Sequence, residues 1–350
     1  MPVKASTLFC KNGNQSGEDG RATNDQRRTT NDQRRTTNDQ RRTLVIGRWS
    51  FVSPEDSVKP APFQYFAPDT LEEALSLLTQ HGDAAKVLAG GQSLIPTMNF
   101  RLAQPAVLID LNNVADLFYI DPAAEGGLRI GAMTRQRTVE RDALIQQQAP
   151  LLHATMPHIA HTQIRNRGTI GGSLAHADPA AELPAVAVTL DAQLRVRSQI
   201  EERWIAARNF YIGLFTTALA PDEILVEIAI PPLPPRTGWS IQEIARRRGD
   251  YAIVGVTALV TLDGAGRCSA ARIALLSVGE GPVQTPQAVQ MLIGETPTPE
   301  LIVAAAQTLA TVDIDPTGDI HASAAYRRHL ANVLSRNTLT QAFQRAGAIL

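Results

Sequence analysis

The sequence predicts an α+β fold. Segments with strand-like alternation and segments with helical periodicity follow one another over residues 60–350, but they do not repeat in strict strand–helix–strand units. Four prolines within residues 231–235 form a linker before the last third of the chain. With 350 residues, of which 44% are hydrophobic, the chain can form two or three domains with separate cores.

The first predicted elements follow Pro60. Phe63–Phe66 is expected to form a strand. Thr70 and Glu73 form the capping box of a helix that ends at Gly82. The apolar face of that helix consists of Leu71, Ala74, Leu75 and Leu78. The next predicted elements are strands over Lys86–Ala89, Ala106–Leu111 and Gly127–Ala132 and a helix over Pro150–Ala160.

A polar, glycine-rich stretch occupies the middle of the chain, over His161–Glu182. We expect this stretch to be a long loop, and loops of this length inside compact domains are usually functional or disordered. The elements predicted after it are a helix over Leu183–Leu190 and strands over Gln193–Arg197 and Asp222–Ile230. Beyond the linker we predict strands over Trp239–Arg246, Ala252–Leu262 and Arg267–Val278, a hairpin turn at Asp263–Gly266, and helices over Thr285–Leu292, Pro299–Leu309 and Ala322–Ala346.

The N-terminal section contains a perfect repeat. Three copies of T-N-D-Q-R-R-T occupy Thr23–Thr29, Thr30–Thr36 and Thr37–Thr43. No position of the repeat is apolar, so a coiled coil has no seam to bury and we expect disorder. Nucleic-acid binding is the functional alternative, although each copy carries only one net positive charge. We expect translation to start near Val58, or residues 1–57 to be dispensable.

Composition excludes several classes of protein. The formal net charge of -1 gives no basic field for nucleic acid. No apolar run reaches the roughly 18–20 residues that span a bilayer, and no secretory signal is present, so we expect a cytoplasmic protein without an integral membrane segment. The two cysteines, Cys10 and Cys268, cannot supply a disulfide framework or the roughly four thiolates of an iron–sulfur cluster. Any redox chemistry must therefore use an organic cofactor.

Two glycine pairs are the main candidates for a binding site. Ala89-Gly90-Gly91-Gln92-Ser93 follows a predicted strand, and Gly168-Thr169-Ile170-Gly171-Gly172-Ser173 lies in the long polar stretch. Glycines let backbone N–H groups approach a phosphate closely, and two such loops could hold a pyrophosphate from two sides. The alternative is that each pair is an ordinary tight turn. The dinucleotide fingerprint G-x-G-x-x-G and the phosphate-binding P-loop are both absent from the sequence.

Two other constellations do not carry a site. Ser173, His176 and Asp178 lie in one short segment without the G-x-S-x-G elbow, so we reject a hydrolase triad. Four histidines could suggest a zinc site, but they do not form an organised ligand set, so we reject this site. They are His153, His158, His161 and His176. The sequence predicts no catalytic residue and no metal ligand.

Four segments together resemble a known family. They are V-L-A-G-G-Q-S-L-I-P (Val87–Pro96), I-G-A-M-T (Ile130–Thr134), Q-I-R-N-R-G-T-I-G-G-S-L-A-H-A-D-P-A-A-E-L-P (Gln163–Pro184) and R-R-G-D-Y-A (Arg247–Ala252). From about Pro60 to the C-terminus, the chain resembles the FAD subunits of the xanthine dehydrogenase family of molybdenum hydroxylases. The medium subunit of aerobic carbon monoxide dehydrogenase is the nearest type.

The resemblance implies a domain organisation. It predicts a vanillyl-alcohol-oxidase (PCMH)-type FAD-binding fold of two α/β subdomains, over residues 58–115 and 116–235. A C-terminal α/β domain of the CO dehydrogenase flavoprotein type would occupy residues 236–350, and residues 1–57 would be a disordered extension.

The resemblance also implies a non-covalently bound FAD and the residues that contact it. The pyrophosphate would be contacted by Ala89, Gly90, Gly91, Gln92, Ser93, Thr169, Ile170, Gly171, Gly172 and Ser173. Further contacts would come from Asp178, Glu182 and Leu225, while Tyr251 would lie beside the isoalloxazine. Glu182 stands where the family often carries Asp, with a ribose or ribityl hydroxyl as its partner. Alternatively, Asp178 or Glu182 caps the following helix, and Tyr251 is a core residue. Arg246, Arg247 and Arg248 form a solvated face or favour an anionic reduced flavin.

The function implied is electron transfer within a larger enzyme. In the family, a molybdopterin-binding large subunit oxidises the substrate, and a small subunit passes electrons through two 2Fe–2S centres to FAD. This chain would deliver them to an external acceptor, in a dimer of heterotrimers. The alternatives are a free-standing FAD-dependent oxidoreductase of the same fold and a non-catalytic assembly protein.

Overall fold

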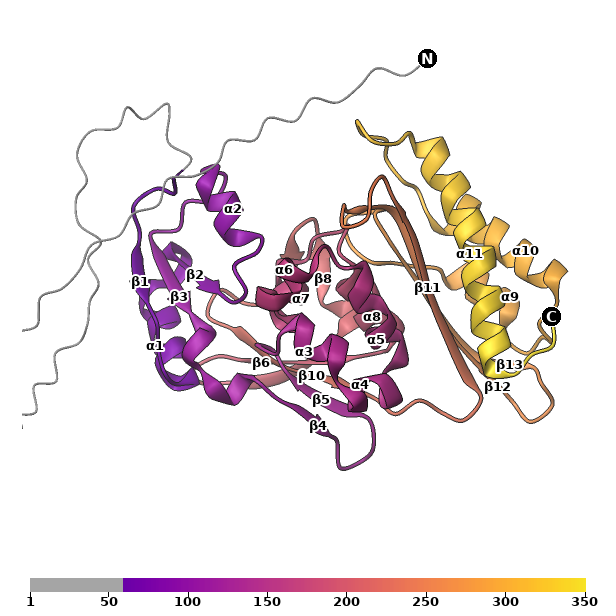
Figure 1. Ribbon diagram of the computed structural model, residues 1–350, viewed down its shortest axis with the longest axis horizontal. Helices are drawn as coiled ribbons and strands as arrows, with labels where there is room; N and C mark the ends of the chain where they lie inside the picture. Colours follow the sequence, from indigo (N-terminus) through magenta and orange to yellow (C-terminus); the bar gives the residue numbers. More distant parts are fainter. Residues whose placement is uncertain (1–58) are drawn as a thin grey trace, which may run out of the picture. The chain divides into compact units, whose positions relative to one another are not determined.

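The computed structural model describes residues 59–350 (Figure 1). The expectations for residues 1–57 and for a start at Val58 therefore lie outside the described residues. Within residues 59–350, three larger sheets and a two-stranded hairpin follow one another along the chain. No helix in this part combines the length and apolar character needed to cross a membrane.

The first sheet is small and parallel, with the order β1-β3-β2. Its strands are β1 (Gln64–Phe66), β2 (Ala85–Leu88) and β3 (Val107–Asp110), and its helices are α1 (Leu71–His81) and α2 (Leu94–Asn99). The capping prediction for α1 is confirmed, because the Thr70 hydroxyl accepts the Glu73 N–H at 3.2 Å. The helix ends at Gly82, which adopts φ +49°.

The second sheet is antiparallel, with the order β4-β5-β10-β6-β7. Its strands are β4 (Ile120–Pro122), β5 (Leu128–Gly131), β6 (Gln193–Arg197), β7 (Glu202–Ala206) and β10 (Ile224–Ile230). Short helices fill its connections: α3 (Gln136–Arg141), α4 (Ala143–Gln148), α5 (Pro150–Thr155), α6 (Thr162–Arg167), α7 (Ile170–His176) and α8 (Glu182–Thr189). The hairpin consists of β8 (Tyr211–Gly213) and β9 (Thr216–Thr217).

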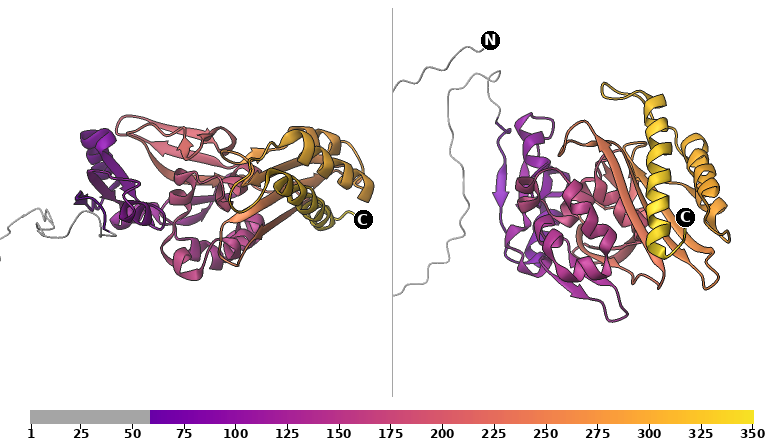
Figure 2. Two further views of the ribbon diagram at one scale, coloured as in Figure 1. Left: turned by 90° about the horizontal axis from the view of Figure 1, so that it is seen from above. Right: turned by 45° about the vertical axis from the view of Figure 1, so that its right-hand side comes forward.

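The third sheet is an antiparallel meander, with the order β11-β12-β13-β14. Its strands are β11 (Thr237–Ala245), β12 (Ala252–Leu262), β13 (Cys268–Leu276) and β14 (Val283–Gln284). The helices after it are α9 (Pro286–Leu292), α10 (Pro299–Thr308) and α11 (Ala324–Ala346). They cover one face of the sheet, and α5 and α8 pack on the other (Figures 1 and 2). Because helices cover both faces of this sheet, the side chains of β12 are buried on both sides, and its sequence is almost continuously apolar.

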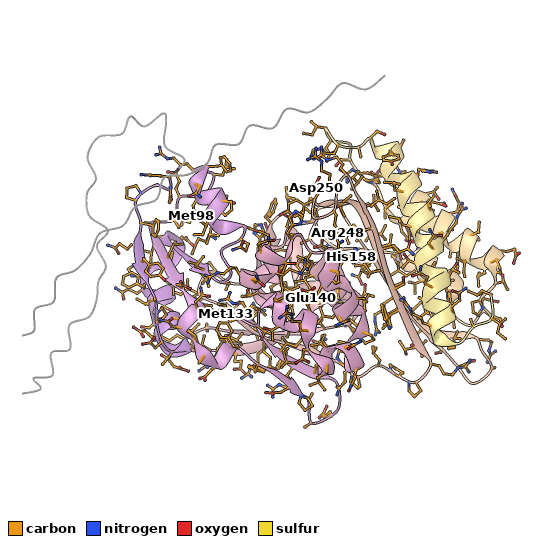
Figure 3. All side chains as sticks on the ribbon, in the orientation of Figure 1. Met98, Met133, Glu140, His158, Arg248 and Asp250 are labelled. Carbon is orange, nitrogen blue, oxygen red and sulfur yellow. The ribbon has the colours of Figure 1, made fainter. Side chains whose placement is uncertain are left out.

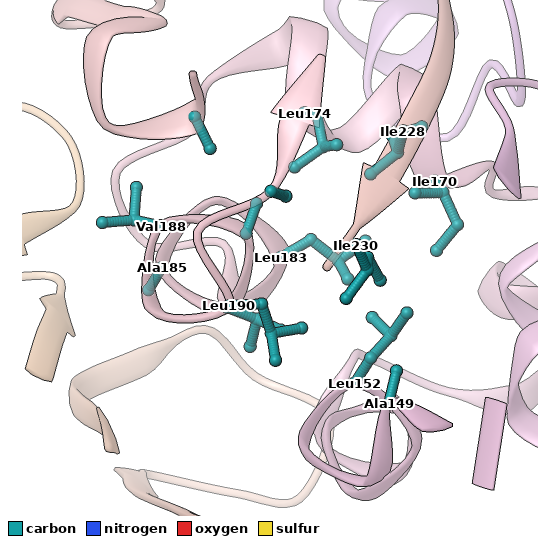
Figure 4. Close-up of a cluster of buried hydrophobic side chains, with 14 of the residues drawn as sticks. Ala149, Leu152, Ile170, Leu174, Leu183, Ala185, Val188, Leu190, Ile228 and Ile230 are labelled. Carbon is teal, nitrogen blue, oxygen red and sulfur yellow. The ribbon is translucent and has the colours of Figure 1, made fainter. Parts of the chain in front are cut away.

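Two hydrophobic cores meet at this third sheet. Ile273 and Leu275 of β13 join the core beneath α9–α11, whereas the alternating Ala274 and Leu276 join the core that contains α8. Figure 4 shows that second core, in which Leu183 of α8 faces side chains of α5, α7 and β10. The packing ties α8, and the segment that precedes it, to both the second and the third sheet.

The expectation of one long loop over His161–Glu182 is wrong, because α6 and α7 occupy most of it. Thr169 caps α7 by accepting the Gly172 N–H at 3.0 Å, and Ala177 ends the helix with φ +52°. The helix lacks apolar periodicity because it uses glycines to pack closely. The predicted helix over Pro150–Ala160 is shorter than expected, since a 3₁₀ turn containing Pro157 replaces its last part.

The predicted domain limits fall between the sheets. The limit at residues 115/116 lies between β3 and β4, and the limit at residues 235/236 lies between β10 and β11. We propose these positions as the boundaries of the three folded units.

Candidate functional site

The first glycine loop offers free backbone donors. It connects β2 to α2, and Gly91 adopts φ +73°, a conformation that favours glycine. Among the described residues, the backbone N–H groups of Gly90, Gly91, Gln92 and Ser93 donate no hydrogen bond. The Gln92 side chain turns back and donates to the Gly90 carbonyl at 3.2 Å. Four neighbouring N–H groups without acceptors are suited to an anion.

The second glycine loop is different, because its backbone donors are engaged. The N–H groups of Ile170 and Gly171 donate to the carbonyls of Thr134 and Ala132, at 3.0 and 2.8 Å. Gly172 donates to the Thr169 hydroxyl. The expected backbone N–H donors of Ile170, Gly171 and Gly172 are therefore already satisfied within the protein. The loop can offer the hydroxyl of Ser173, which makes no hydrogen bond among the described residues.

The two loops lie against each other. A Cβ added at Gly90 would stand 2.6 Å from the Arg167 carbonyl oxygen and 2.7 Å from the Gly168 Cα. A Cβ at Gly172 would lie 3.1 Å from the Cβ of Ala89. Because these neighbours come from a distant part of the chain, the glycines do more than allow local turns. They let the backbone after β2 of the first sheet touch the backbone between α6 and α7, which belong to a connection of the second sheet.

The I-G-A-M-T segment supports the second loop from behind. A Cβ at Gly171 would lie 2.5 Å from the Cβ of Ala132, so α7 rests directly on the end of β5. Three of the four motifs that the sequence singled out therefore meet at one place. The fourth, at Arg247–Ala252, lies at the junction of β11 and β12.

Asp178 lies in the segment before α8, and Glu182 is the first residue of α8. Neither residue caps the helix. The residue before α8 is Ala181, which makes no side-chain cap, and the Asp178 carboxylate accepts the Ala180 N–H at 2.9 Å in a local turn. Glu182 is 7% exposed. Its burial, and secondly the charge of Glu243, raise the pKa of Glu182 to about 7.

Tyr251 is not a core residue, because 62% of it is exposed. Partial burial, together with the nearby carboxylate of Asp178, raises the pKa of Tyr251 to about 12. An exposed ring beside Asp178 and Glu182 is available for stacking. Leu225, by contrast, is buried in the hydrophobic core on β10, and its role as a cofactor contact stays a prediction.

Two further residues considered from the sequence, His176 and Arg246, make contacts with other side chains. The His176 ring packs against Phe215 at 5.2 Å, and Arg246 pairs with Asp250 at 3.7 Å on an exposed turn. In the described part of the chain, no group of three His, Cys, Asp or Glu side chains could hold a metal ion.

Comparison with known proteins identifies the family. A model of the FAD-binding domain in molybdopterin dehydrogenases matches residues 61–233, and a model of the CO dehydrogenase flavoprotein C-terminal domain matches residues 239–342. The 6-hydroxypseudooxynicotine dehydrogenase complex subunit alpha of Paenarthrobacter nicotinovorans is 43% identical over 83% of this chain and 97% of that protein. The chain belongs to the FAD-binding medium subunits of molybdenum hydroxylases.

Solved structures of medium subunits share this fold. The carbon monoxide dehydrogenase of Hydrogenophaga pseudoflava superimposes with a TM-score of 0.79 at 35% identity, covering 82% of this chain and 99% of that chain. The quinoline 2-oxidoreductase of Pseudomonas putida 86 gives a TM-score of 0.77 at 39% identity, with the same coverage. The predicted family, fold and FAD cofactor are therefore confirmed, and the chain is an oxidoreductase subunit.

The residues at the glycine loops fit the FAD of a medium subunit. The pyrophosphate of FAD is anionic, and Gly90–Ser93 present four uncommitted N–H donors. Side chains larger than hydrogen at Gly90 or Gly172 would occupy the space between the loops. Which individual residues contact FAD stays a prediction at every position.

The sequence did not reveal a polar clamp behind the loops. The Asn112 side chain donates to the Ala89 carbonyl at 3.0 Å, and the Asp110 carboxylate accepts the Asn112 N–H at 2.9 Å. Arg135 donates both to the Asn112 side-chain oxygen and to the Arg167 carbonyl. Arg135 thus connects the first loop to the second. The only local signal was its position directly after the I-G-A-M-T segment.

We expect Arg135→Gln to weaken FAD binding about tenfold, which corresponds to about 1.4 kcal/mol. The variant loses two charge-assisted hydrogen bonds that hold the loops in register. Titration of the FAD-free chain with FAD, followed by flavin fluorescence, measures the affinity. Arg137→Gln is the matched control, since Arg137 lies in the first turn of α3, which Arg135 directly precedes, and its ion pair in the described part of the chain is with Glu140. Equal affinities of both variants would contradict the clamp.

Proposed function

We propose that this chain is the electron-transferring FAD subunit of a molybdenum hydroxylase and that it holds the FAD pyrophosphate where its two glycine loops meet. The observation that carries the proposal is the backbone contact of Gly90 with Arg167 and Gly168, beside four uncommitted N–H groups.

The chain's own residues bind and orient the cofactor. The N–H groups of Gly90–Ser93 would hold the phosphate oxygens, the Ser173 hydroxyl would add a donor, and Tyr251 would cover the flavin ring. When bound, FAD supplies the redox chemistry by accepting electrons and passing them to an external acceptor.

The electrons must come from a partner. Cys268 is buried, and burial raises the pKa of its thiol to about 11, which disfavours the thiolate that an iron–sulfur cluster requires. The similar proteins include a subunit alpha of a dehydrogenase complex and the medium chains of carbon monoxide dehydrogenases. We infer a small subunit with 2Fe–2S centres and a large molybdopterin-binding subunit as partners, in a dimer of heterotrimers. The cytoplasmic location stays a prediction.

Purification of the tagged chain from its native cells tests this function. We expect two further subunits to co-purify, with molybdenum and iron in the complex and about one FAD per copy of this chain. Acid precipitation should release the FAD, because it is held non-covalently. The chain produced alone should bind FAD but contain neither metal and oxidise no substrate. Turnover by the single chain would instead support a free-standing oxidoreductase, and a complex without FAD would support an assembly protein.

A further inference from the structure

A surface cavity of about 340 Å³ lies between the end of α10 and α11. Its size is in the range of sites that bind small molecules. In Figure 3 the labelled Met98 marks α2, which follows the first glycine loop, and the helices α10 and α11 lie at the other end of the folded part of the chain. The cavity is therefore separate from the proposed FAD site, and the function described above does not use its residues.

One wall of the cavity is a turn of π-helix. This turn, Leu309–Asp313, directly follows α10 and contributes Ala310 and Thr311 to the lining. The Thr311 hydroxyl donates to the Gln307 carbonyl at 2.8 Å. Turns of π-helix are rare, and they occur frequently at functional sites. The irregular end of α10 is thus a second indication, independent of the cavity's size, that this place binds something.

The cavity is positively charged, although the chain as a whole has a formal net charge of -1. Arg328 and Arg336 line it, and no Asp or Glu of the described residues does. Arg336 makes no hydrogen bond or ion pair within residues 59–350. Arg328 pairs with Asp315, whose side chain is 94% exposed. An ion pair with so exposed a partner is weak, so Arg328 can exchange Asp315 for an anionic ligand.

A buried amide lies between the two arginines. Asn332 is four residues from each of them on α11, which is about 6 Å of helix rise and within the length of an arginine side chain. It is 8% exposed and donates to the Gln307 Oε1 at 2.6 Å, while its own Oδ1 is buried without a partner in the described part of the chain. Leaving such an oxygen unsatisfied is costly. A ligand hydroxyl can both donate and accept, so it can satisfy either end of this amide.

These features together specify a class of ligand. Guanidinium groups bind phosphate through paired hydrogen bonds, and the His329 imidazole in the lining is a further donor. Val333 adds apolar contact surface for a carbon chain. We propose that this cavity binds a small phosphate ester that carries a hydroxyl group, with the phosphate between Arg328 and Arg336 and the hydroxyl at Asn332. The site would be a second ligand site of the chain, beyond the proposed function.

Isothermal titration calorimetry of the FAD-loaded full-length chain with glycerol 3-phosphate tests the site. We expect one binding event per chain, and inorganic phosphate, which has no hydroxyl-bearing carbon chain, should bind about tenfold more weakly. Arg336→Gln should weaken glycerol 3-phosphate binding about tenfold, because it removes a charge-assisted contact. Asp315→Asn should strengthen binding, since it frees Arg328 and removes a nearby negative charge. Arg141→Gln, at an exposed position of α3, is the control and should leave the affinity unchanged.

A further variant adds charge without removing an arginine. Thr311→Glu places a carboxylate in an exposed part of the cavity wall and should abolish binding, while flavin content and circular dichroism stay as in the wild type. Absence of binding to the wild type, or equal affinities of the wild type, Arg336→Gln and Thr311→Glu, would overturn the site. Equal affinities for glycerol 3-phosphate and inorganic phosphate would overturn the hydroxyl contact at Asn332. Binding of tetraglutamate without binding of glycerol 3-phosphate would overturn the ligand class in favour of an acidic protein segment.

Discussion

Replacing Gly90 with valine should abolish FAD binding at micromolar cofactor. The new Cβ would collide with backbone atoms of Arg167 and Gly168, at 2.6 and 2.7 Å, and the two loops would have to separate. Overpacking of this kind costs about 1–3 kcal/mol, and losing the register of the donors adds to it, so the affinity should fall at least about a hundredfold. Flavin content per chain after gel filtration measures the loss.

The control is Gly264→Val, because a Cβ at Gly264 meets nothing within 4 Å. Its flavin content should equal that of the wild type. The corresponding changes at Gly91 and Gly172 should be milder, since their nearest neighbours are side-chain atoms, although the φ of +73° at Gly91 adds strain. Full flavin content in Gly90→Val would show that the pyrophosphate is bound elsewhere.

Arg165→Met should lower the free energy of unfolding by about 3–5 kcal/mol. Arg165 is 6% exposed and forms a two-pronged ion pair with Glu140, at 2.9 and 3.1 Å, while it also donates to the Ile159 carbonyl at 2.8 Å. Methionine fills much of the volume but leaves the carboxylate and the carbonyl without this donor. Urea unfolding followed by circular dichroism measures the difference.

Arg137→Met is the matched control, because Arg137 pairs with the same Glu140 at 2.8 Å but lies nearer the surface. We expect it to cost less than about 1 kcal/mol. The hydrogen bond from Arg165 lowers the pKa of Glu140, so the ion pair stabilises the protein above the ordinary value of 4.5 and loses this effect as the pH falls. The difference between wild type and Arg165→Met should therefore shrink in acid. Equal losses for both arginines at pH 7 would contradict a buried pair.

The sequence predicted most of the elements that have a local signature. Gln193–Arg197 and Ala252–Leu262 have the predicted bounds, because alternation and a continuous apolar run are encoded within the strand itself. The capping box at Thr70 is equally local. The error over His161–Glu182 arose because α7 is held by a threonine cap and by glycine packing on Ala132, and neither produces an apolar period.

The site was predictable only in part for the same reason. Glycine pairs are visible in a sequence, but the contact between Gly90 and Gly168 is a tertiary one that no local pattern reports. The difference between the loops also depends on tertiary contacts, since the acceptors for the second loop are carbonyls of Ala132 and Thr134. Nothing in the sequence distinguishes three polar residues that make specific contacts in the folded protein, namely Arg135, Asn112 and Glu243.

The first glycine loop belongs to a connection of the first sheet, and the second belongs to a connection of the second sheet. A ligand that touches both loops therefore stabilises the form of the protein in which the loops are in contact over any form in which they have separated. A ligand at a hundred times its dissociation constant adds about 2.7 kcal/mol in this way. Newly made chains that have not yet acquired FAD would open first at the contact between the two loops, and proteases would degrade these chains preferentially. The supply of flavin would thus determine how much of this subunit survives to join its complex.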